Sequence, residues 1–99
     1  MKEIQHLVDG ATMASTSGRT GPVYDPATGE QTGTVALASV AEVDAAIASA
    51  SAAFEAWGEV SLARRTKLML DFRNLVVEHA DDIARRLTAE HGKVLDDAR

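Results

Sequence analysis

The sequence predicts an α+β segment, with short strands in residues 1–38 and amphipathic helices in residues 39–99. The first observation is the density of glycine and proline in the first third, because both residues interrupt helices. They stand at Gly10, Gly18, Gly21, Pro22, Pro26, Gly29 and Gly33. The second observation is that apolar residues recur every three or four positions from Ser39 onward, which is the helical period. We therefore expect no long helix before Ser39.

A hairpin is expected near the start of the chain. Asp9-Gly10 lies between Leu7-Val8 and Ala11-Thr12, which are apolar or tolerated in strands. An Asp-Gly pair suits a two-residue turn in which both residues have positive φ. The small, polar stretch from Ala14 to Gly21 is expected to connect elements over the surface, with little core of its own.

A second turn is expected at Asp25-Pro26-Ala27-Thr28-Gly29-Glu30, after Val23-Tyr24. Proline sets φ near −65° at the start of such a turn, and glycine closes it at positive φ. The chain should then continue as a strand from Thr32 to Leu37.

The first helix should begin after Ser39. Ser39 and Glu42 have the spacing of a capping box, in which each side chain accepts a hydrogen bond from the other's backbone amide. Gly58 is expected to end the helix. The apolar stripe consists of Val43, Ile47, Ala50, Phe54 and Trp57. We expect this stripe to stay partly exposed unless a further sheet covers it.

A second helix should start at Ser61, which is a favoured N-cap residue. Its apolar face is assigned to Leu68, Phe72, Leu75 and Val76. Its wet side is assigned to Arg64, Arg65, Lys67, Asp71 and Glu78.

A third helix should follow, with Asp81 and Asp82 in its first turn, where carboxylates favour the helix dipole. Arg85 and Arg86 stand four residues after these carboxylates and are expected to pair with them. Ile83 and Leu87 are expected to face inward. Gly92 should stop the helix in the left-handed conformation. Residues 94–99 again have a helical composition, so we expect that the protein continues beyond Arg99.

Composition narrows the function. The net charge is −5, which disfavours nucleic acid as a partner, and no apolar run approaches the ~20 residues of a membrane span. Met1 to Gly10 has no secretory apolar segment, and its acidic residues argue against a mitochondrial transit peptide. A cytoplasmic location is therefore expected. Cysteine is absent, which excludes disulfides and thiolate chemistry within these residues.

No residue of the chain is predicted to be catalytic, cofactor-binding or metal-ligating. The three histidines lack a second metal ligand at a recognised spacing, and the two serines that precede helices are better explained as caps. Gly29 and Gly33 do not form the Gly-x-Gly-x-x-Gly fingerprint of dinucleotide binding. The acidic pairs are interpreted as helix starts. The residues considered are His6, His79, His91, Ser39, Ser61, Asp81, Asp82, Asp96 and Asp97.

The order of the motifs resembles the start of an aldehyde dehydrogenase. The resemblance runs through His6-Leu7-Val8-Asp9-Gly10, Val23-Tyr24-Asp25-Pro26-Ala27-Thr28-Gly29-Glu30, Gly33-Thr34-Val35, Val40 to Ala46, Ala53 to Trp57, and Arg64-Arg65 with Leu68. Glu90-His91-Gly92-Lys93 is similar to the family's Glu-x-Gly-Lys turn. Ser17-Gly18-Arg19-Thr20 and residues 90–98 are most similar to the CoA-acylating methylmalonate-semialdehyde dehydrogenases.

The resemblance implies an α/β fold in which residues 1–99 are an incomplete, N-terminal portion of the NAD-binding domain of a much longer enzyme. It implies NAD and coenzyme A as cofactors, and oxidation of methylmalonate or malonate semialdehyde to propionyl-CoA or acetyl-CoA, as in valine catabolism. It also implies a homo-oligomer, typically a homotetramer, and a catalytic cysteine thiolate. No cysteine is present, so the site residues must lie elsewhere and no cofactor is expected to bind this segment alone. The partner of the segment is then the remainder of its own chain.

The alternative is a freestanding, non-catalytic helical interaction module, favoured by the amphipathic helices and the acidic surface. A cooperative melt of the isolated chain supports the module, and a molten or aggregating chain supports the enzyme segment. The few large apolar side chains must offset a backbone entropy of ~1 to 2 kcal/mol per residue, which favours the enzyme segment.

Overall fold

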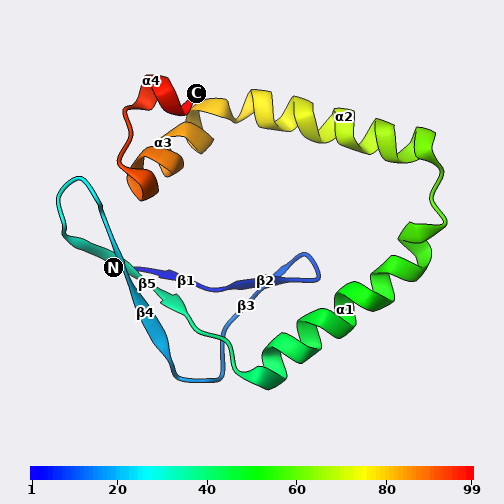
Figure 1. Ribbon diagram of the computed structural model, residues 1–99, viewed down its shortest axis with the longest axis horizontal. Coiled ribbons are helices and arrows are strands. Elements are labelled where there is room, and N and C mark those ends of the chain that lie inside the picture. Colours follow the sequence, from blue (N-terminus) through cyan, green and yellow to red (C-terminus); the bar gives the residue numbers. More distant parts are fainter. The chain divides into compact units, whose positions relative to one another are not determined.

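The computed structural model describes residues 1–99, which form five strands and four helices (Figure 1). The strands are β1 (Lys2–Ile4), β2 (His6–Val8), β3 (Ala11–Met13), β4 (Thr20–Tyr24) and β5 (Gln31–Ala36). The helices are α1 (Val40–Gly58), α2 (Leu62–Glu78), α3 (Ala80–His91) and α4 (Leu95–Ala98). The expected order of strands followed by helices is confirmed. The chain divides into unit 1, residues 1–24 and 31–59, and unit 2, residues 25–30 and 60–99.

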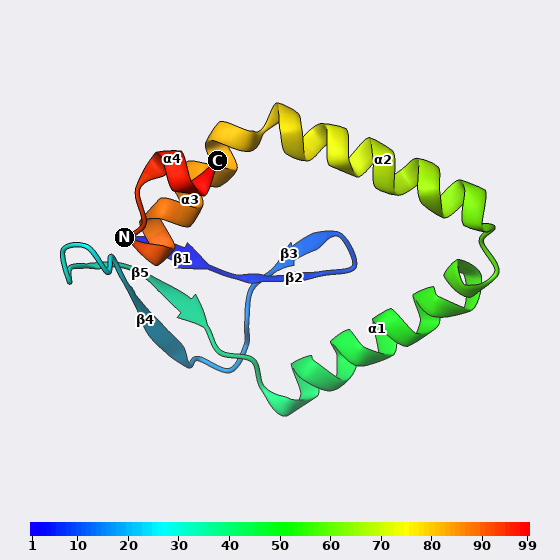
Figure 2. The same cartoon turned by 45° about the horizontal axis from the view of Figure 1, so that its top comes forward.

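The three-stranded sheet of unit 1 has the order β1-β5-β4, and both views show its strands side by side (Figures 1 and 2). β4 pairs antiparallel with β5, whereas β1 pairs parallel with β5, with Lys2 opposite Gly33. Gly33 is buried, and a Cβ there would collide with the backbone carbonyl oxygen of Lys2. Glycine at this position therefore permits the close approach of the two strands.

The predicted hairpin is confirmed. β2 and β3 pair antiparallel with Val8 opposite Ala11, so Asp9 and Gly10 form the two-residue turn. Both turn residues have positive φ, 50° at Asp9 and 72° at Gly10. These are the angles that a twist-matched hairpin turn requires.

The connection after the hairpin is shorter and better anchored than the sequence predicts. β4 already begins at Thr20, where Thr20 pairs with Ala36, so the expected loop to Gly21 is two residues too long. Ser15 and Ser17 are half-buried, and both hydroxyls donate to the carbonyl oxygen of Leu37. Small polar side chains thus satisfy a backbone acceptor that follows β5.

The turn at residues 25–30 is confirmed and belongs to unit 2. The amide of Gly29 donates to the carbonyl oxygen of Asp25 over 2.7 Å, and Gly29 has φ 76°. The carboxylate of Asp25 accepts from the amide of Ala27 at 2.8 Å, which is an Asx turn. A Cβ on Gly92 would lie 3.1 Å from Cγ of Pro26, so this turn packs closely against the end of α3.

Both predicted helix starts are confirmed. Ser39 and Glu42 form the complete capping box of α1, and the hydroxyl of Ser61 accepts from the amide of Arg64 at 3.2 Å. α1 ends at Gly58, but its C-cap is Glu59 in the right-handed conformation rather than a left-handed glycine. The left-handed stop expected at Gly92 is present, with φ 84°.

Two expectations for α3 are wrong. Ile83 and Leu87 are exposed, and the fully buried residue of the helix is Ala84. Arg85 pairs with Asp82 at 2.7 Å, whereas Asp81 pairs with Arg99 at 2.9 Å instead of with an arginine of its own helix. Arg99 also reaches Asp96, so one guanidinium joins α3 to α4. A long arginine side chain from the following helix competes successfully with the local partner.

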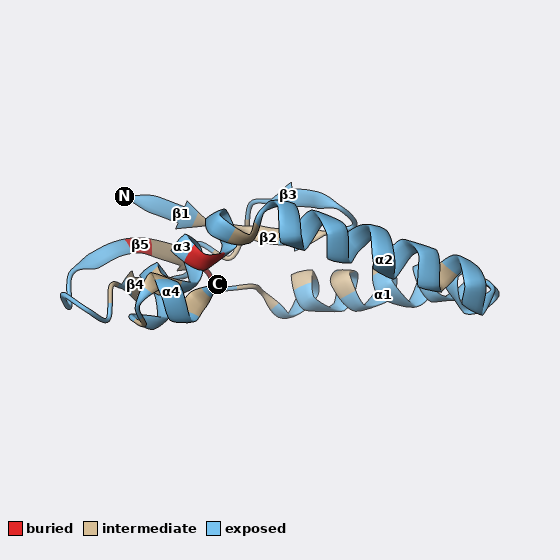
Figure 3. Ribbon diagram, turned by 90° about the horizontal axis from the view of Figure 1, so that it is seen from above, coloured by how far each residue is buried: buried red, intermediate tan, exposed pale blue.

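The core of the chain is very small. Only two hydrophobic residues are buried, Ala36 on β5 and Ala84 on α3, both coloured red in Figure 3. The large side chains of the α1 stripe are exposed as expected, Ile47 by 62%, Phe54 by 68% and Trp57 by 40%. No helix combines the length and the apolar character needed to cross a bilayer. Most of the apolar surface on these helices is therefore not covered within these 99 residues.

Candidate functional site

The most highly connected polar group of the chain is the carboxylate of Glu42, in the first turn of α1. Its Oε1 accepts from the backbone amide of Thr16 at 2.6 Å and from the Thr16 hydroxyl at 3.0 Å. Its Oε2 accepts from the backbone amide of Ser39 at 2.8 Å and from the hydroxyl of Ser15 at 2.9 Å. These four bonds tie the β3–β4 connection to the start of α1.

The same bonds determine the protonation state of Glu42. The backbone amides of Thr16 and then Ser39, followed by the hydroxyl of Ser15, lower the pKa of Glu42 from its ordinary 4.5 to about 2. Donors that favour the charged form act in this direction. The carboxylate is therefore ionised at neutral pH and its acceptor sites are used by the fold. It is unsuited to general base catalysis, which needs a pKa near the working pH.

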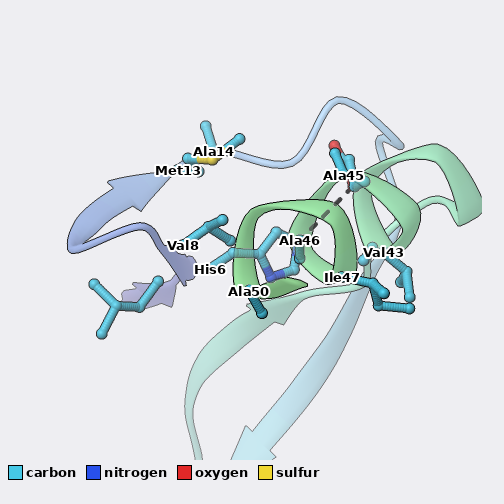
Figure 4. A pocket seen from close by; sticks show the side chains of 12 residues that line it. His6, Val8, Met13, Ala14, Val43, Ala45, Ala46, Ile47 and Ala50 are labelled. Carbon is cyan, nitrogen blue, oxygen red and sulfur yellow. Dashed lines mark ion pairs between the residues drawn. The ribbon is translucent and has the colours of Figure 1, made fainter. Parts of the chain in front are cut away.

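A pocket of about 510 Å³ adjoins this cluster and separates the β2–β3 hairpin from α1 (Figure 4). Its titratable lining groups are His6 and Glu42, and the rest of its wall is apolar. The Nε2 atom of His6 lies 3.9 Å from Oε2 of Glu42, is shielded from solvent and has no hydrogen-bond partner. The apolar lining consists of Leu7, Val8, Met13, Ala14, Ala38, Val43, Ala45, Ala46, Ile47 and Ala50.

The chemistry of this pocket suits an apolar occupant. A dinucleotide carries a negatively charged pyrophosphate, which is normally held by backbone amides at a helix N-terminus. Here the N-terminal amide of Ser39 is already bound to Glu42, whose own negative charge would repel a phosphate. The residues present therefore do not fit NAD. No group of three or more His, Cys, Asp or Glu side chains has the arrangement of a metal site.

The histidines and serines considered from the sequence have separate structural positions. His6 lines the pocket of unit 1, His79 lies between α2 and α3 in unit 2, and His91 is in the last turn of α3. Ser39 and Ser61 are helix caps. The link from Glu42 to Thr16 was not predicted, because the capping box is a local signal and the two residues are 26 positions apart.

Within unit 2, two of the motifs behind the family resemblance meet. The left-handed turn at Gly92, within Glu90-His91-Gly92-Lys93, packs against Pro26 of the Asp-Pro-Ala-Thr-Gly turn. Residues 12–99 match the model of the aldehyde dehydrogenase family. The chain belongs to the aldehyde dehydrogenase family. This membership favours the enzyme segment over a freestanding helical module.

The curated relatives carry a more specific name. Over 97 residues the chain is 43% identical to malonate-semialdehyde dehydrogenase 3 of Geobacillus kaustophilus and 41% identical to malonate-semialdehyde dehydrogenase 2 of Geobacillus thermodenitrificans. Each comparison covers 98% of this chain and 20% of the relative. The chain thus spans one fifth of the length of these dehydrogenases.

Solved structures agree with the family and with the mixed α/β fold. A protein from Sinorhizobium meliloti assigned to the methylmalonate-semialdehyde dehydrogenases, complexed with NAD, is 44% identical with a TM-score of 0.94. The methylmalonate-semialdehyde dehydrogenase of Oceanimonas doudoroffii is 38% identical with a TM-score of 0.93. Each covers 99% of this chain, and this chain covers 20% of each. The conformation described above is therefore very similar to one found within a much longer dehydrogenase.

Proposed function

We propose that this chain is the N-terminal portion of an NAD-dependent, CoA-acylating aldehyde dehydrogenase that oxidises malonate semialdehyde or methylmalonate semialdehyde. The products would be acetyl-CoA or propionyl-CoA. The identity to malonate-semialdehyde dehydrogenases over 98% of the chain carries the proposal. NAD as the oxidant is supported by the similar Sinorhizobium meliloti protein, which is complexed with it. The proposal includes a cytoplasmic homo-oligomer.

The role proposed for these residues is architectural. The nucleophile of the family is a cysteine thiolate, and this chain contains no cysteine. The pocket beside Glu42 does not fit a dinucleotide, as argued above. Residues 1–38 and 39–99 would supply outer strands and outer helices of the NAD-binding domain. The catalytic thiolate and the NAD contacts would come from the remainder of the polypeptide.

The first test is enzymatic and uses the full-length protein encoded by the gene that contains this segment. NADH formation would be followed by absorbance with malonate semialdehyde or methylmalonate semialdehyde, with and without coenzyme A. We expect turnover with NAD to require coenzyme A for release of the acyl group, and acetyl-CoA or propionyl-CoA to appear by mass spectrometry. NADP and a simple aliphatic aldehyde serve as matched controls.

Three outcomes separate the parts of the proposal. Turnover that yields free carboxylic acid and ignores coenzyme A would contradict the acylating chemistry but retain the oxidation. Turnover of the aliphatic aldehyde alone would contradict the substrate class. A reading frame without a cysteine or a nucleotide-binding segment would contradict the enzyme itself.

A further inference from the structure

α2 differs from the other helices because it carries large apolar side chains on two faces. The first face consists of Leu68, Phe72, Leu75 and Val76, and the second of Leu70 and Val77. We infer that α2 is enclosed between two layers of its own polypeptide in the full-length protein. This inference rests on the proposed function, because it requires that the segment is part of a longer chain.

The two faces follow from helical geometry. A helix turns by about 100° per residue, so Leu70 lies about 200° from Leu68, on the far side of the axis. Val77 is seven residues after Leu70 and therefore lies almost directly above it. Leu70 is 58% exposed and Val77 57% exposed, as much as the first face, where Leu68 is 50% and Phe72 57% exposed. Neither face is covered within this chain.

The polar residues of α2 leave only a narrow side for solvent. Lys67, Asp71, Asn74 and Glu78 repeat at spacings of three and four, so they lie along one stripe of the helix. Lys67 and Asp71 form an exposed ion pair of 2.6 Å within this stripe. A helix that is apolar over most of its circumference is typical of one packed on more than one side. The polar stripe marks where α2 meets water.

α1 provides the contrast within the same chain. Its large apolar side chains Val43, Ile47 and Phe54 lie along one stripe. The opposite stripe of α1 is formed by small residues, Ala41, Ala45, Ala48, Ala52 and Ala56. An alanine face buries little area, whereas leucine and valine each contribute ~1.5 to 3 kcal/mol when covered. The second face of α2 thus indicates a second contact that α1 does not need.

A layer of the same polypeptide is the occupant that the sizes favour. The structure of the Sinorhizobium meliloti protein matches 99% of this chain with only 20% of its own, so most of such a protein lies outside this segment. A second copy would need about 800 Å² per partner for a stable interface. Leu70 and Val77 together bury on the order of 200 Å². A patch of this size suits an intramolecular contact, which does not have to offset the entropy of association.

Cysteine labelling of the full-length protein tests the inference. The variants are Leu70→Cys on the second face, Leu68→Cys on the first face and Asp71→Cys on the polar stripe. Each is labelled with a maleimide and read peptide by peptide by mass spectrometry, with the rate divided by that of the same variant unfolded in urea. We expect Leu70→Cys and Leu68→Cys to react at least tenfold more slowly than Asp71→Cys, with equal protection over a hundredfold dilution.

Each other outcome overturns the inference in a recognisable way. If Leu70→Cys reacts as fast as Asp71→Cys while Leu68→Cys is protected, α2 is covered on one face only. If protection of Leu70→Cys falls on dilution, the occupant is a second copy. If both apolar sites react freely in a protein that oxidises semialdehydes, the proposed function holds and the enclosure of α2 fails. Amide exchange of the unsubstituted protein provides a second readout that needs no variant.

Discussion

The backbone amide of Thr16 donates a 2.6 Å hydrogen bond to Oε1 of Glu42, 26 positions further along the chain. The same carboxylate caps α1 through the amide of Ser39. One ionised group therefore holds a surface connection and a helix start together. Because backbone amides donate both bonds, substitutions of the donor side chains leave these two contacts in place.

Acid should weaken this link. The pKa of Glu42 is about 2 in the folded chain and 4.5 ordinarily, so the unfolded chain binds the proton more readily. The stabilisation by Glu42 is fully present above pH 4.5 and is lost as the pH falls toward 2. We expect faster exchange of the Thr16 and Ser39 amides across this window, measured by hydrogen exchange with correction for intrinsic rates.

The Glu42→Gln variant is the control for the acid effect. It has no proton to gain, so its Thr16 and Ser39 amides should show no additional loss of protection between pH 4.5 and 2. A variant that loses protection over the same window as the wild type would show that another group is responsible.

Gly33→Ala should disrupt the parallel pairing of β1 with β5. The added Cβ meets the backbone carbonyl of Lys2, which cannot move without separating the strands. We expect a loss of ~1 to 3 kcal/mol in unfolding free energy by chemical denaturation of the full-length protein, as for overpacking elsewhere. Gly21→Ala is the matched control, because its Cβ would lie 3.5 Å from Cγ1 of Val35, an ordinary contact. Equal losses for the two variants would contradict the close approach of β1 and β5.

Gly92→Ala should destabilise unit 2 for two reasons. Its φ of 84° is left-handed, which costs an L-residue roughly 1 to 2 kcal/mol, and its Cβ would press on Pro26. Gly18→Ala has the same kind of strain, with φ 70°, but meets nothing within 4 Å. Thermal unfolding should therefore show a larger loss for Gly92→Ala. If both variants unfold at the same temperature, the contact between the two turns contributes nothing.

The isolated 99-residue chain should unfold without a sharp transition. Its buried apolar residues are only Ala36 and Ala84, which supply little of the burial that cooperative folding requires. Calorimetry should show a broad or absent heat peak. Trp57 is the only tryptophan and is 40% exposed, so acrylamide should quench its fluorescence readily. A sharp melt with a shielded Trp57 would support an independent module instead.

Some contacts could not be predicted from the sequence because their partners are distant along the chain. β1 is three residues long and carries no turn signal, and its parallel pairing with β5 depends on Lys2 meeting Gly33. Arg99 pairs with Asp81, 18 positions earlier, in place of the helical neighbour that the spacing favoured. Ala84 is buried and Ile83 is exposed, since burial depends on what lies opposite rather than on side-chain size.

The amino-acid sequence by itself determined the elements whose causes are local. The Asp9-Gly10 turn, the caps at Ser39 and Ser61 and the left-handed Gly92 each depend on conformational preferences within a few residues. Only the tertiary structure decided that Glu42 binds Thr16, that β1 joins β5 in parallel and that two family motifs meet at Gly92 and Pro26. Those contacts join segments far apart in the chain, and no short-range preference encodes which distant group will be close enough to bind.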